Sequence, residues 1–550
     1  MAAKPRRINL AMVVLLGAYA VASLMVLTRP GAALSGDDRA VVRIAHWQIE
    51  AGPREGIDAM IKRYMELNPH VRVEQVAVPG RIYKQWLRTQ LIGGTAPDII
   101  EFGRLFNADD IPPRFFEQIS DLVEKPNPYN KGTPMEGVRW RDTFNDGLDT
   151  PDTYIENLSN FYGVTLCMLS TRLFYNAELL EEISGSSKAP ASFAELRVFS
   201  EKLAQYNAEA EQPISMYAGS KFNGQLLMEG MLSRAGVGLN ISKDRLREQG
   251  QQARDVSVDF LRGNWDYRAP ELQAGLKLMR EIARNLRPGF QQLERDAAMQ
   301  EFMRGQAPMI ITGTWDATSL TSLAPFKVGV AKFPWPDRTN KEVGQHYWGP
   351  LSERDNTSFP LCVNRLSPHK KETIDFLHFI TSVEGNTIFF EKSGWLPATR
   401  GVVVPKEQQV YLPNPKGLSV RSAYMAGFGP ETATLWQRQL YRLVSPQGSV
   451  EGFLEEFEKK FPEALKSDLR NKTRHLTLSL RHDMQPLMAL AMLDRLLAPD
   501  PKRIKSRVVR ESSQNIAEAR LYEALAALER GPDVGRASRT DSNREMSNEL

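Results

Sequence analysis

Aromatic residues stand at the ends of several segments whose composition predicts β-strands. They include Trp47 after Val41–His46, Phe102 at the end of Asp98–Phe102, and Trp315 after Met309–Thr312. In open α/β sheets the ligand binds beyond the carboxyl ends of the strands. An aromatic ring at that edge can stack on the C–H face of a sugar ring, while neighbouring Glu, Asp and Gln side chains accept its hydroxyl hydrogens. Core packing is the alternative for any single ring, but burying an indole N–H without a partner is unfavourable.

The chain carries none of the short motifs that mark common catalytic sites. It has no phosphate-binding loop, no H-E-x-x-H zinc helix, no G-x-S-x-G nucleophile elbow and no EF-hand loop. His369 and His378 are not at helical ligand spacing, and no second ligand stands near His346. A glycosidase would need two carboxylates at a set separation, which a sequence does not reveal. The pattern favours a binding protein and predicts no metal and no cofactor.

Composition excludes several other classes of protein. The 550 residues are 25% charged and 42% hydrophobic, as expected for a globular chain with a sizeable core. The net charge of +4 is too small to indicate nucleic-acid binding. Only Cys167 and Cys362 are present, which excludes a disulfide scaffold and a cysteine-rich metal site. A mean hydropathy of -0.38 leaves room for one membrane span at most.

The aromatic residues are set among alternating strands and helices. The predicted strands include 41–46, 71–78 and 98–102, with helices at 55–67 and 83–92 between them. The alternating pattern returns at 308–312, 326–330, 361–363 and 373–381. Strand–helix–strand order of this kind is typical of an α/β fold with a parallel sheet. The carboxyl ends of such strands meet at one edge, so the residues that follow them are brought together.

The N-terminal segment, residues 1–36, predicts export. Lys4, Arg6 and Arg7 precede an apolar run from Ile8 to Leu27. Such a run is long enough to span a bilayer, and the basic residues would keep its short N-terminal side in the cytoplasm. Small residues near Ala20 also offer sites for signal peptidase. Both readings, an uncleaved anchor and a cleaved signal peptide, place the rest of the chain outside the cytoplasmic membrane.

Several short segments, in this order and spacing, carry a family resemblance. They are Ile61–Pro69, Gly93–Ile99, Tyr162–Thr165, Phe174–Asn176, Pro190–Leu203, Phe302–Trp315, Phe326–Pro334 and Ser367–Pro397. Together they resemble the family 1 extracellular solute-binding proteins of ABC importers, the group that includes maltose-binding protein. The resemblance covers about three-quarters of the chain, from Val41 to Phe457.

The resemblance implies two α/β lobes joined by a hinge, with a small solute held between them. Lobe one is expected at 40–166 and 328–385, and lobe two at 167–327 and 386–457. The partners implied are a mono- or oligosaccharide and the ABC permease subunits in the membrane, with the binding protein itself a monomer. Cys167 would lie at the hinge and Cys362 in lobe one. They are expected either to be packed as small residues or to pair in an oxidising compartment.

The same resemblance implies a set of ligand-binding residues. They are Trp47, Tyr83, Glu101, Phe102 and Arg104 from lobe one, and Phe222, Trp315, Asp316, Trp348, Trp395 and Trp436, of which Phe222, Trp315, Asp316 and Trp436 are expected to face the solute from lobe two. Arg104 departs from the lining expected for a neutral sugar. An acidic sugar would give it a bidentate partner, and a surface salt bridge is the alternative.

The C-terminal stretch extends beyond the family's usual end. Residues 458–530 predict a helical extension, and 531–550 a disordered tail without aromatic residues. A basic cluster from Lys502 to Arg510 separates two apolar helical segments. The extension either docks on lobe two as a hairpin or contacts the membrane or an importer subunit. Two functions other than import also stay open: a ligand sensor that reports to a signalling partner, and an enzyme that processes glycosides.

Overall fold

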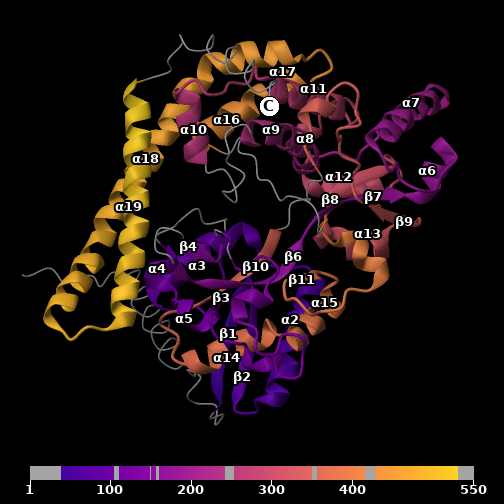
Figure 1. Cartoon of the computed structure of the whole chain (residues 1–550). Coiled ribbons are helices and arrows are strands. Elements are labelled where there is room, and N and C mark those ends of the chain that lie inside the picture. Colours follow the sequence, from indigo (N-terminus) through magenta and orange to yellow (C-terminus); the bar gives the residue numbers. More distant parts are fainter. Residues whose placement is uncertain are drawn as a thin grey trace, which may run out of the picture.

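The computed structural model describes residues 39–103, 111–148, 150, 152–155, 160–241, 253–349, 356–414 and 428–530. These residues form two α/β lobes, each built on its own sheet (Figure 1). The first is a sheet of six strands in the order β11-β6-β10-β3-β1-β2. Its strands are β1 (Ala40–His46), β2 (Val71–Ala77), β3 (Ile99–Glu101), β6 (Gly163–Leu169), β10 (Asn356–Val363) and β11 (Leu396–Pro397). We call this sheet and the helices on it lobe one.

Strands β1, β2 and β3 of lobe one run parallel, whereas β10 is antiparallel to β3 and β6. The helices of this lobe are α2 (Ala51–Leu67), α3 (Gly80–Gly93), α4 (Ile111–Phe115), α5 (Ser120–Val123), α14 (Lys370–Ile380) and α15 (Val383–Ser393), and a small hairpin is made by β4 (Tyr154–Ile155) and β5 (Asn160–Phe161). The apolar stripe of α2, from Ile57 to Tyr64, is buried. Gly56 lets α2 approach α15 closely, since a Cβ there would lie 2.8 Å from the Phe389 ring.

Lobe two is built on a sheet of three strands in the order β8-β7-β9. Its strands are β7 (Thr171–Asn176), β8 (Met309–Gly313) and β9 (Val328–Ala331), and both outer strands are antiparallel to β7. Its helices are α6 (Ala177–Ser184), α7 (Phe193–Glu209), α8 (Lys221–Ala235), α9 (Val237–Ile241), α10 (Ala253–Leu261), α11 (Pro270–Arg284), α12 (Arg295–Met303), α13 (Ala317–Leu323), α16 (Pro430–Gln439) and α17 (Tyr441–Val444). One large apolar cluster, with Met231, Leu276 and Phe453 among its buried members, joins most of them.

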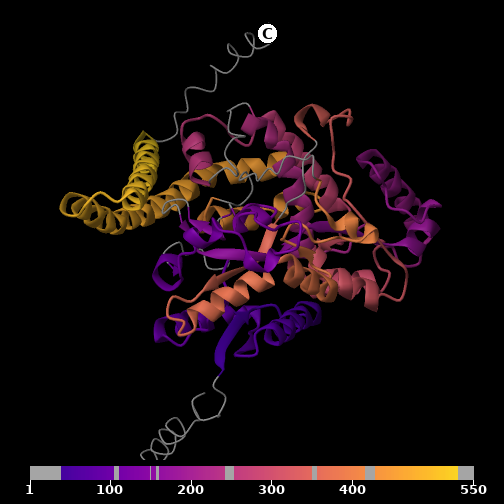
Figure 2. The ribbon, with the colours of Figure 1, turned by 60° about the horizontal axis from the view of Figure 1, so that its bottom comes forward.

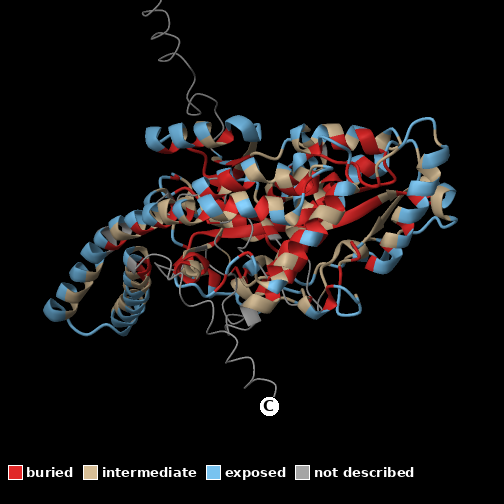
Figure 3. Cartoon of the chain, turned by 90° about the horizontal axis from the view of Figure 1, so that it is seen from above, coloured by how far each residue is buried: buried red, intermediate tan, exposed pale blue. Residues whose placement is uncertain are grey.

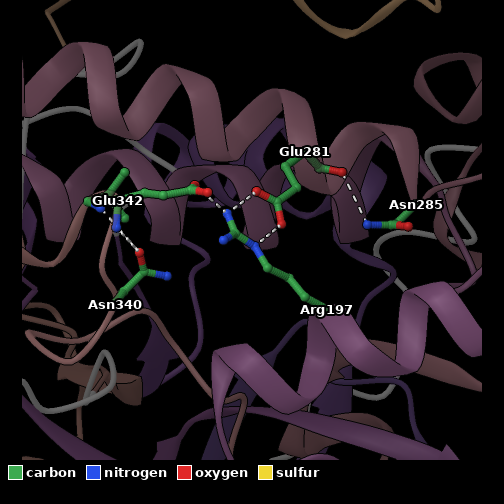
Figure 4. Close-up of polar contacts among 6 residues, drawn as sticks. Arg197, Glu281, Asn285, Asn340 and Glu342 are labelled. Atoms are coloured by element: carbon green, nitrogen blue, oxygen red, sulfur yellow. Dashed lines mark hydrogen bonds and ion pairs between the residues drawn. The ribbon is translucent and has the colours of Figure 1, made fainter.

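A polar network holds α7 against α11 at the edge of lobe two (Figure 4). Arg197 donates two hydrogen bonds of 2.8 Å to the carboxylate of Glu281, and its Nη2 also lies 3.1 Å from Glu342. Asn285 donates to the backbone oxygen of Glu281, and Asn340 accepts from the backbone N–H of Glu342. The planar guanidinium therefore fixes one helix, a second helix and a loop in one arrangement.

The chain passes between the lobes where β6 leads through Ser170 into β7 (Figure 1). A second crossing is the segment 400–412, which is fastened to β7 by Arg172. This guanidinium is fully buried and donates to the backbone oxygens of Val410, Tyr411 and Leu412 at 2.6–2.7 Å. Burying a charge is costly unless its donors are satisfied, and here carbonyl oxygens satisfy them.

Two elements lie in a different lobe from the one expected from the sequence. Strand β9 pairs with β7, and its Val328 and Val330 pack against the lobe-two cluster around Phe174. Strand β11 pairs with β6, while Phe389 and Trp395 join the core of lobe one. The chain therefore returns to lobe one after β9, and leaves it after β11.

The two cysteines are free and buried in adjacent strands of lobe one. Cys167 lies opposite Ser358, and Cys362 lies opposite Gly163, so the thiols are not partners across the ladder. They are packed residues, which was one of the two expectations.

The C-terminal region forms a long helical hairpin. Helix α18 (Val450–Leu496) begins in the core of lobe two, where Phe453, Phe457 and Phe461 are buried. Helix α19 (Pro501–Arg530) returns along it, and Ala524 and Ala527 rejoin the same core. Figures 1 and 2 show the hairpin projecting from lobe two, and Figure 3 shows that its outer part is largely exposed.

Among the described residues, no helix is long and apolar enough to cross a membrane. The predicted signal or anchor segment at 1–36 and the predicted tail at 531–550 lie outside the described residues.

Candidate functional site

Glu101 joins the two loops that follow β1 and β3 at the carboxyl edge of the sheet. Its carboxylate is fully buried and accepts the backbone N–H of Trp47 at 3.0 Å and the Nε2–H of Gln48 at 2.6 Å. Burial raises the pKa of this carboxyl group well above its ordinary value, while the two hydrogen bonds oppose that rise. Both carboxylate oxygens are therefore occupied by hydrogen bonds within the protein, and Glu101 positions the loop that carries Trp47.

Tyr83 lies beneath this loop and is part of the core. Its hydroxyl donates to the backbone oxygens of Ala45 and Glu101, and its side chain is 1% exposed. The ring of Trp47 packs edge-on against it, with centroids 5.2 Å apart. Trp47 remains partly exposed, so it is the aromatic ring of this loop that a solute can reach. The ring and hydroxyl of Tyr83 are used in packing, and its role in the ligand site stays a prediction that Tyr83→Phe tests.

Phe102 is likewise directed into lobe one, where its ring packs edge-on against Phe116 at 4.9 Å. The side chain is 6% exposed, which leaves little surface for a solute. Arg104, the next predicted residue along the chain, lies outside the described residues.

Lobe two brings Phe222 and Trp315 together. Phe222 lies in the first turn of α8, which Ser220 caps by accepting the backbone N–H of Asn223. Trp315 follows β8, and the two ring centroids are 6.1 Å apart. Both side chains are partly buried, and the indole nitrogen of Trp315 is itself covered. Trp315 also packs against the core cluster of lobe one, so this aromatic pair lies where the lobes meet.

The carboxylate of Asp316, predicted to bind the solute, is hydrogen-bonded to other side chains of lobe two. Its carboxylate accepts hydrogen bonds from Arg295 Nη2 at 2.7 Å and Thr312 Oγ1 at 2.5 Å, and it is 4% exposed. Burial raises the pKa of the Asp316 carboxyl group, and these two contacts oppose the rise. The residue also borders a surface cavity of about 300 Å³ between α12 and α13. Asp316 thus fixes the turn that presents Trp315.

Glu50 is a residue that the sequence reasoning missed. It precedes α2, and its charge raises the pKa of Glu101 in lobe one and of Asp316 in lobe two. Glu50 therefore lies within electrostatic range of a carboxyl group in each lobe. Its position in the sequence could have marked it as a candidate, because Glu50 stands three residues beyond Trp47, in the loop that follows a predicted strand.

The remaining predicted tryptophans do not join this group. Trp395 is 3% exposed and packs against Phe389 in the core of lobe one. Trp436 is also 3% exposed and is surrounded by Tyr267, Phe453 and Phe457. Both rings fill a core, and their role in binding a ligand stays a prediction.

Trp348 lies on the surface of lobe two and is 39% exposed. The guanidinium of Arg338 stacks 4.2 Å from its ring centroid, and Gly238 of α9 lies beside its indole nitrogen. This cation–π contact explains the position of the ring without a solute.

Two lobes joined by crossing segments, with partly exposed aromatic rings where they meet, define the class of two-lobed binding proteins. Residues 59–411, more than half of the chain, match the family described as bacterial extracellular solute-binding protein. The chain belongs to this family, which confirms the family and the fold expected from the sequence. Membership implies an extracytoplasmic location and a role in binding a solute.

Solved structures share this fold at low sequence identity. A chitin oligosaccharide binding protein is 16% identical, with a TM-score of 0.53 over 78% of this chain and 99% of that chain. The apo-form of RafE from Streptococcus pneumoniae is 16% identical, with a TM-score of 0.53 over 78% and 98%. MalE from Listeria monocytogenes, in complex with maltose, is 16% identical, with a TM-score of 0.52 over 79% and 99%. No curated protein sequence matches the chain.

Proposed function

We propose that the protein captures a carbohydrate between its lobes and delivers it to the permease of an ABC importer. The observation that carries this proposal is the aromatic pair of Phe222 and Trp315, which is partly exposed at the junction of the lobes. With Trp47 on lobe one, rings are available from both lobes to stack on the apolar faces of sugar rings. The structures named for chitin oligosaccharide, raffinose and maltose support the same class of solute.

Capture would proceed by hinge closure. A solute that contacts Trp47 and Trp315 together binds the closed arrangement better than the open one, and the difference in binding free energy drives closure. The crossing at Ser170 and the segment fastened by Arg172 would form the hinge. In this proposal lobe one comprises about 40–166 and 356–400, and lobe two comprises about 171–331 and 428–469.

The N-terminal segment would keep the protein at the membrane where the permease lies. We propose that residues 1–36 either anchor the chain or are removed as a signal peptide, and that the binding protein acts as a monomer. In both cases the permease receives the solute at the outer face of the membrane.

The proposal is tested by thermal unfolding of the purified protein against a panel of neutral, acidic and oligomeric sugars. A ligand that binds only the native state adds about 2.7 kcal/mol to the free energy of unfolding at a hundredfold excess over Kd. For a protein of this size we expect the cognate sugar to raise the melting temperature by about 2 °C or more. Trp315→Ala should abolish this shift, because it removes the stacking surface.

Trp348→Ala is the matched control, since Trp348 is an exposed tryptophan of the same lobe with a cation–π partner of its own. It should retain the full shift. Stabilisation by amines, phosphates or metal ions, with none by any sugar, would refute the carbohydrate assignment while leaving the fold and family intact.

A further inference from the structure

The outer part of the C-terminal hairpin, residues 470–510, has an uncovered helical face. We call these residues the distal arm. Arg474, Arg481, Met488 and Arg495 are spaced seven residues apart on α18, which places them on one line along the helix. All four side chains are exposed. Beside this line lie further exposed apolar residues, namely Met484 (45%), Met492 (61%) and Leu496 (76%).

Helix α19 packs on a different face of α18, about 100° around the helix from this line, and leaves the line uncovered. Leu480 is buried against Ala517 and Leu521 of α19. Nearer the tip, Asp494 accepts hydrogen bonds from Arg503 and Arg507 at 2.5 Å and 2.7 Å. Helices α18 and α19 therefore already pack against each other, and the exposed residues of the line take no part in that contact.

The positive net charge of the distal arm exceeds that of the whole protein. Residues 470–510 contain ten Lys and Arg against three Asp, whereas the whole chain has a net charge of only +4. The remainder of the chain is thus slightly acidic. A basic element that projects from an acidic body is complementary to an anionic surface.

The residue types favour a lipid surface over a protein partner. No Phe, Tyr or Trp occurs between Phe461 and Tyr522, although protein interfaces usually depend on such anchors. Met and Leu are flexible and can enter disordered hydrocarbon, while Arg buries its aliphatic stem and keeps its charge at the headgroups. The family description, extracellular solute-binding protein, also places the protein outside the cytoplasm. We infer that the distal arm docks on the surface of a bilayer that contains anionic lipid.

A fluorescent label at the arm tests this inference in the full chain. Met488→Cys gives one accessible thiol, because Cys167 and Cys362 are 0% and 1% exposed. A polarity-sensitive dye on this thiol should shift to shorter wavelength with vesicles of equal phosphatidylglycerol and phosphatidylcholine. The shift should weaken with added salt and with pure phosphatidylcholine vesicles. Leu496→Cys, labelled in the same way, gives an independent second site.

Val403→Cys is the matched control, since Val403 is an apolar residue that is 83% exposed elsewhere on the protein. It should show no shift, even if the N-terminal segment brings the chain to the vesicles. Replacing Arg474, Arg481 and Arg495 with Gln should lower the affinity of the arm for anionic vesicles, measured from the dye shift against lipid concentration, about fivefold for each side chain.

Three results would overturn the inference. They are no shift at Met488→Cys and Leu496→Cys with anionic vesicles, an equal shift at Val403→Cys, and a vesicle-free shift that grows with protein concentration. The last result would assign the uncovered face to a second copy of the chain.

Discussion

Two buried polar residues determine what the loop after β1 presents to a solute. Glu101 holds the backbone of Trp47 and the side chain of Gln48, and Tyr83 supports the Trp47 ring from below. The sequence predicts which residue types gather at the carboxyl edge of the sheet, because strand ends meet there. It does not predict which of these side chains are buried by packing. Trp47 and Phe102 both stand at strand ends, and only their neighbours in the folded chain make one partly exposed and the other buried.

Tyr83→Phe separates the packing role of this residue from a ligand-binding role. The change keeps the ring and leaves the backbone oxygens of Ala45 and Glu101 without their hydroxyl donor, so we expect unfolding to become easier by about 1 kcal/mol. Solute affinity should stay within about twofold of the native value, as measured by calorimetry. Tyr441→Phe, at a site 51% exposed, should change neither quantity. A large loss of affinity with unchanged stability would return Tyr83 to the ligand site.

His378 makes the stability of lobe one depend on pH. Burial against Trp140, at 4.1 Å between ring centroids, lowers the pKa of His378 to about 4, and Asp375 only partly offsets this. The unfolded chain, with an ordinary pKa of about 6.5, binds the proton that the folded chain excludes. Between these two values the free energy of unfolding should fall by about 1.4 kcal/mol per pH unit on acidification because of this residue.

His378→Phe should remove that contribution, which urea unfolding at several pH values between about 6 and about 4.5 would measure. His46 contributes a slope of the same sign, because burial lowers its pKa to about 4 as well. Changing the exposed His70 to Asn should leave the slope as it is in the native chain. An unchanged slope in His378→Phe would contradict the assignment.

At the scale of elements, the sequence pattern predicts the bounds of the first strand and helix to within a few residues of those observed. The strand predicted at 41–46 is observed as Ala40–His46, and the helix predicted at 55–67 as Ala51–Leu67. Lobe assignment fails at β9 and β11, because both are short and their pairing is decided by partners distant in sequence. Helix α18 runs from Val450 to Leu496 and continues through Pro462 and Pro486. Proline ordinarily interrupts a helix.

Arg172→Met tests the fastening between β7 and the second crossing segment. The substitution keeps much of the buried volume but leaves the oxygens of Val410, Tyr411 and Leu412 without their donors. We expect a loss of about 3 kcal/mol or more in the free energy of unfolding, measured with denaturant. Small-angle scattering should also show a wider spread of lobe separations without solute. Equal scattering profiles for Arg172→Met and the native chain would argue against a hinge role.

For the whole molecule, the C-terminal hairpin divides into a part that completes lobe two and a part that does not. Phe453, Phe457 and Phe461 are core residues, so a chain ending at Ser449 should not fold. Replacing residues 474–510 with a short Gly/Ser linker keeps these contacts and those of Ala524 and Ala527. We expect this variant to melt within about 3 °C of the native chain and to bind its solute unchanged. A collapse of the melting temperature would show that the distal arm is required for folding.

The hairpin is also a lever. Helix α18 is continuous from the core of lobe two to its tip, and 47 residues at 1.5 Å each give a rod of about 70 Å. If lobe two turns by about 10° about an axis perpendicular to this rod, the far end moves by about 12 Å relative to the base of the helix. A movement too small to see at Trp315 would be large at Leu496, and the tip therefore registers whether the lobes are apart or together.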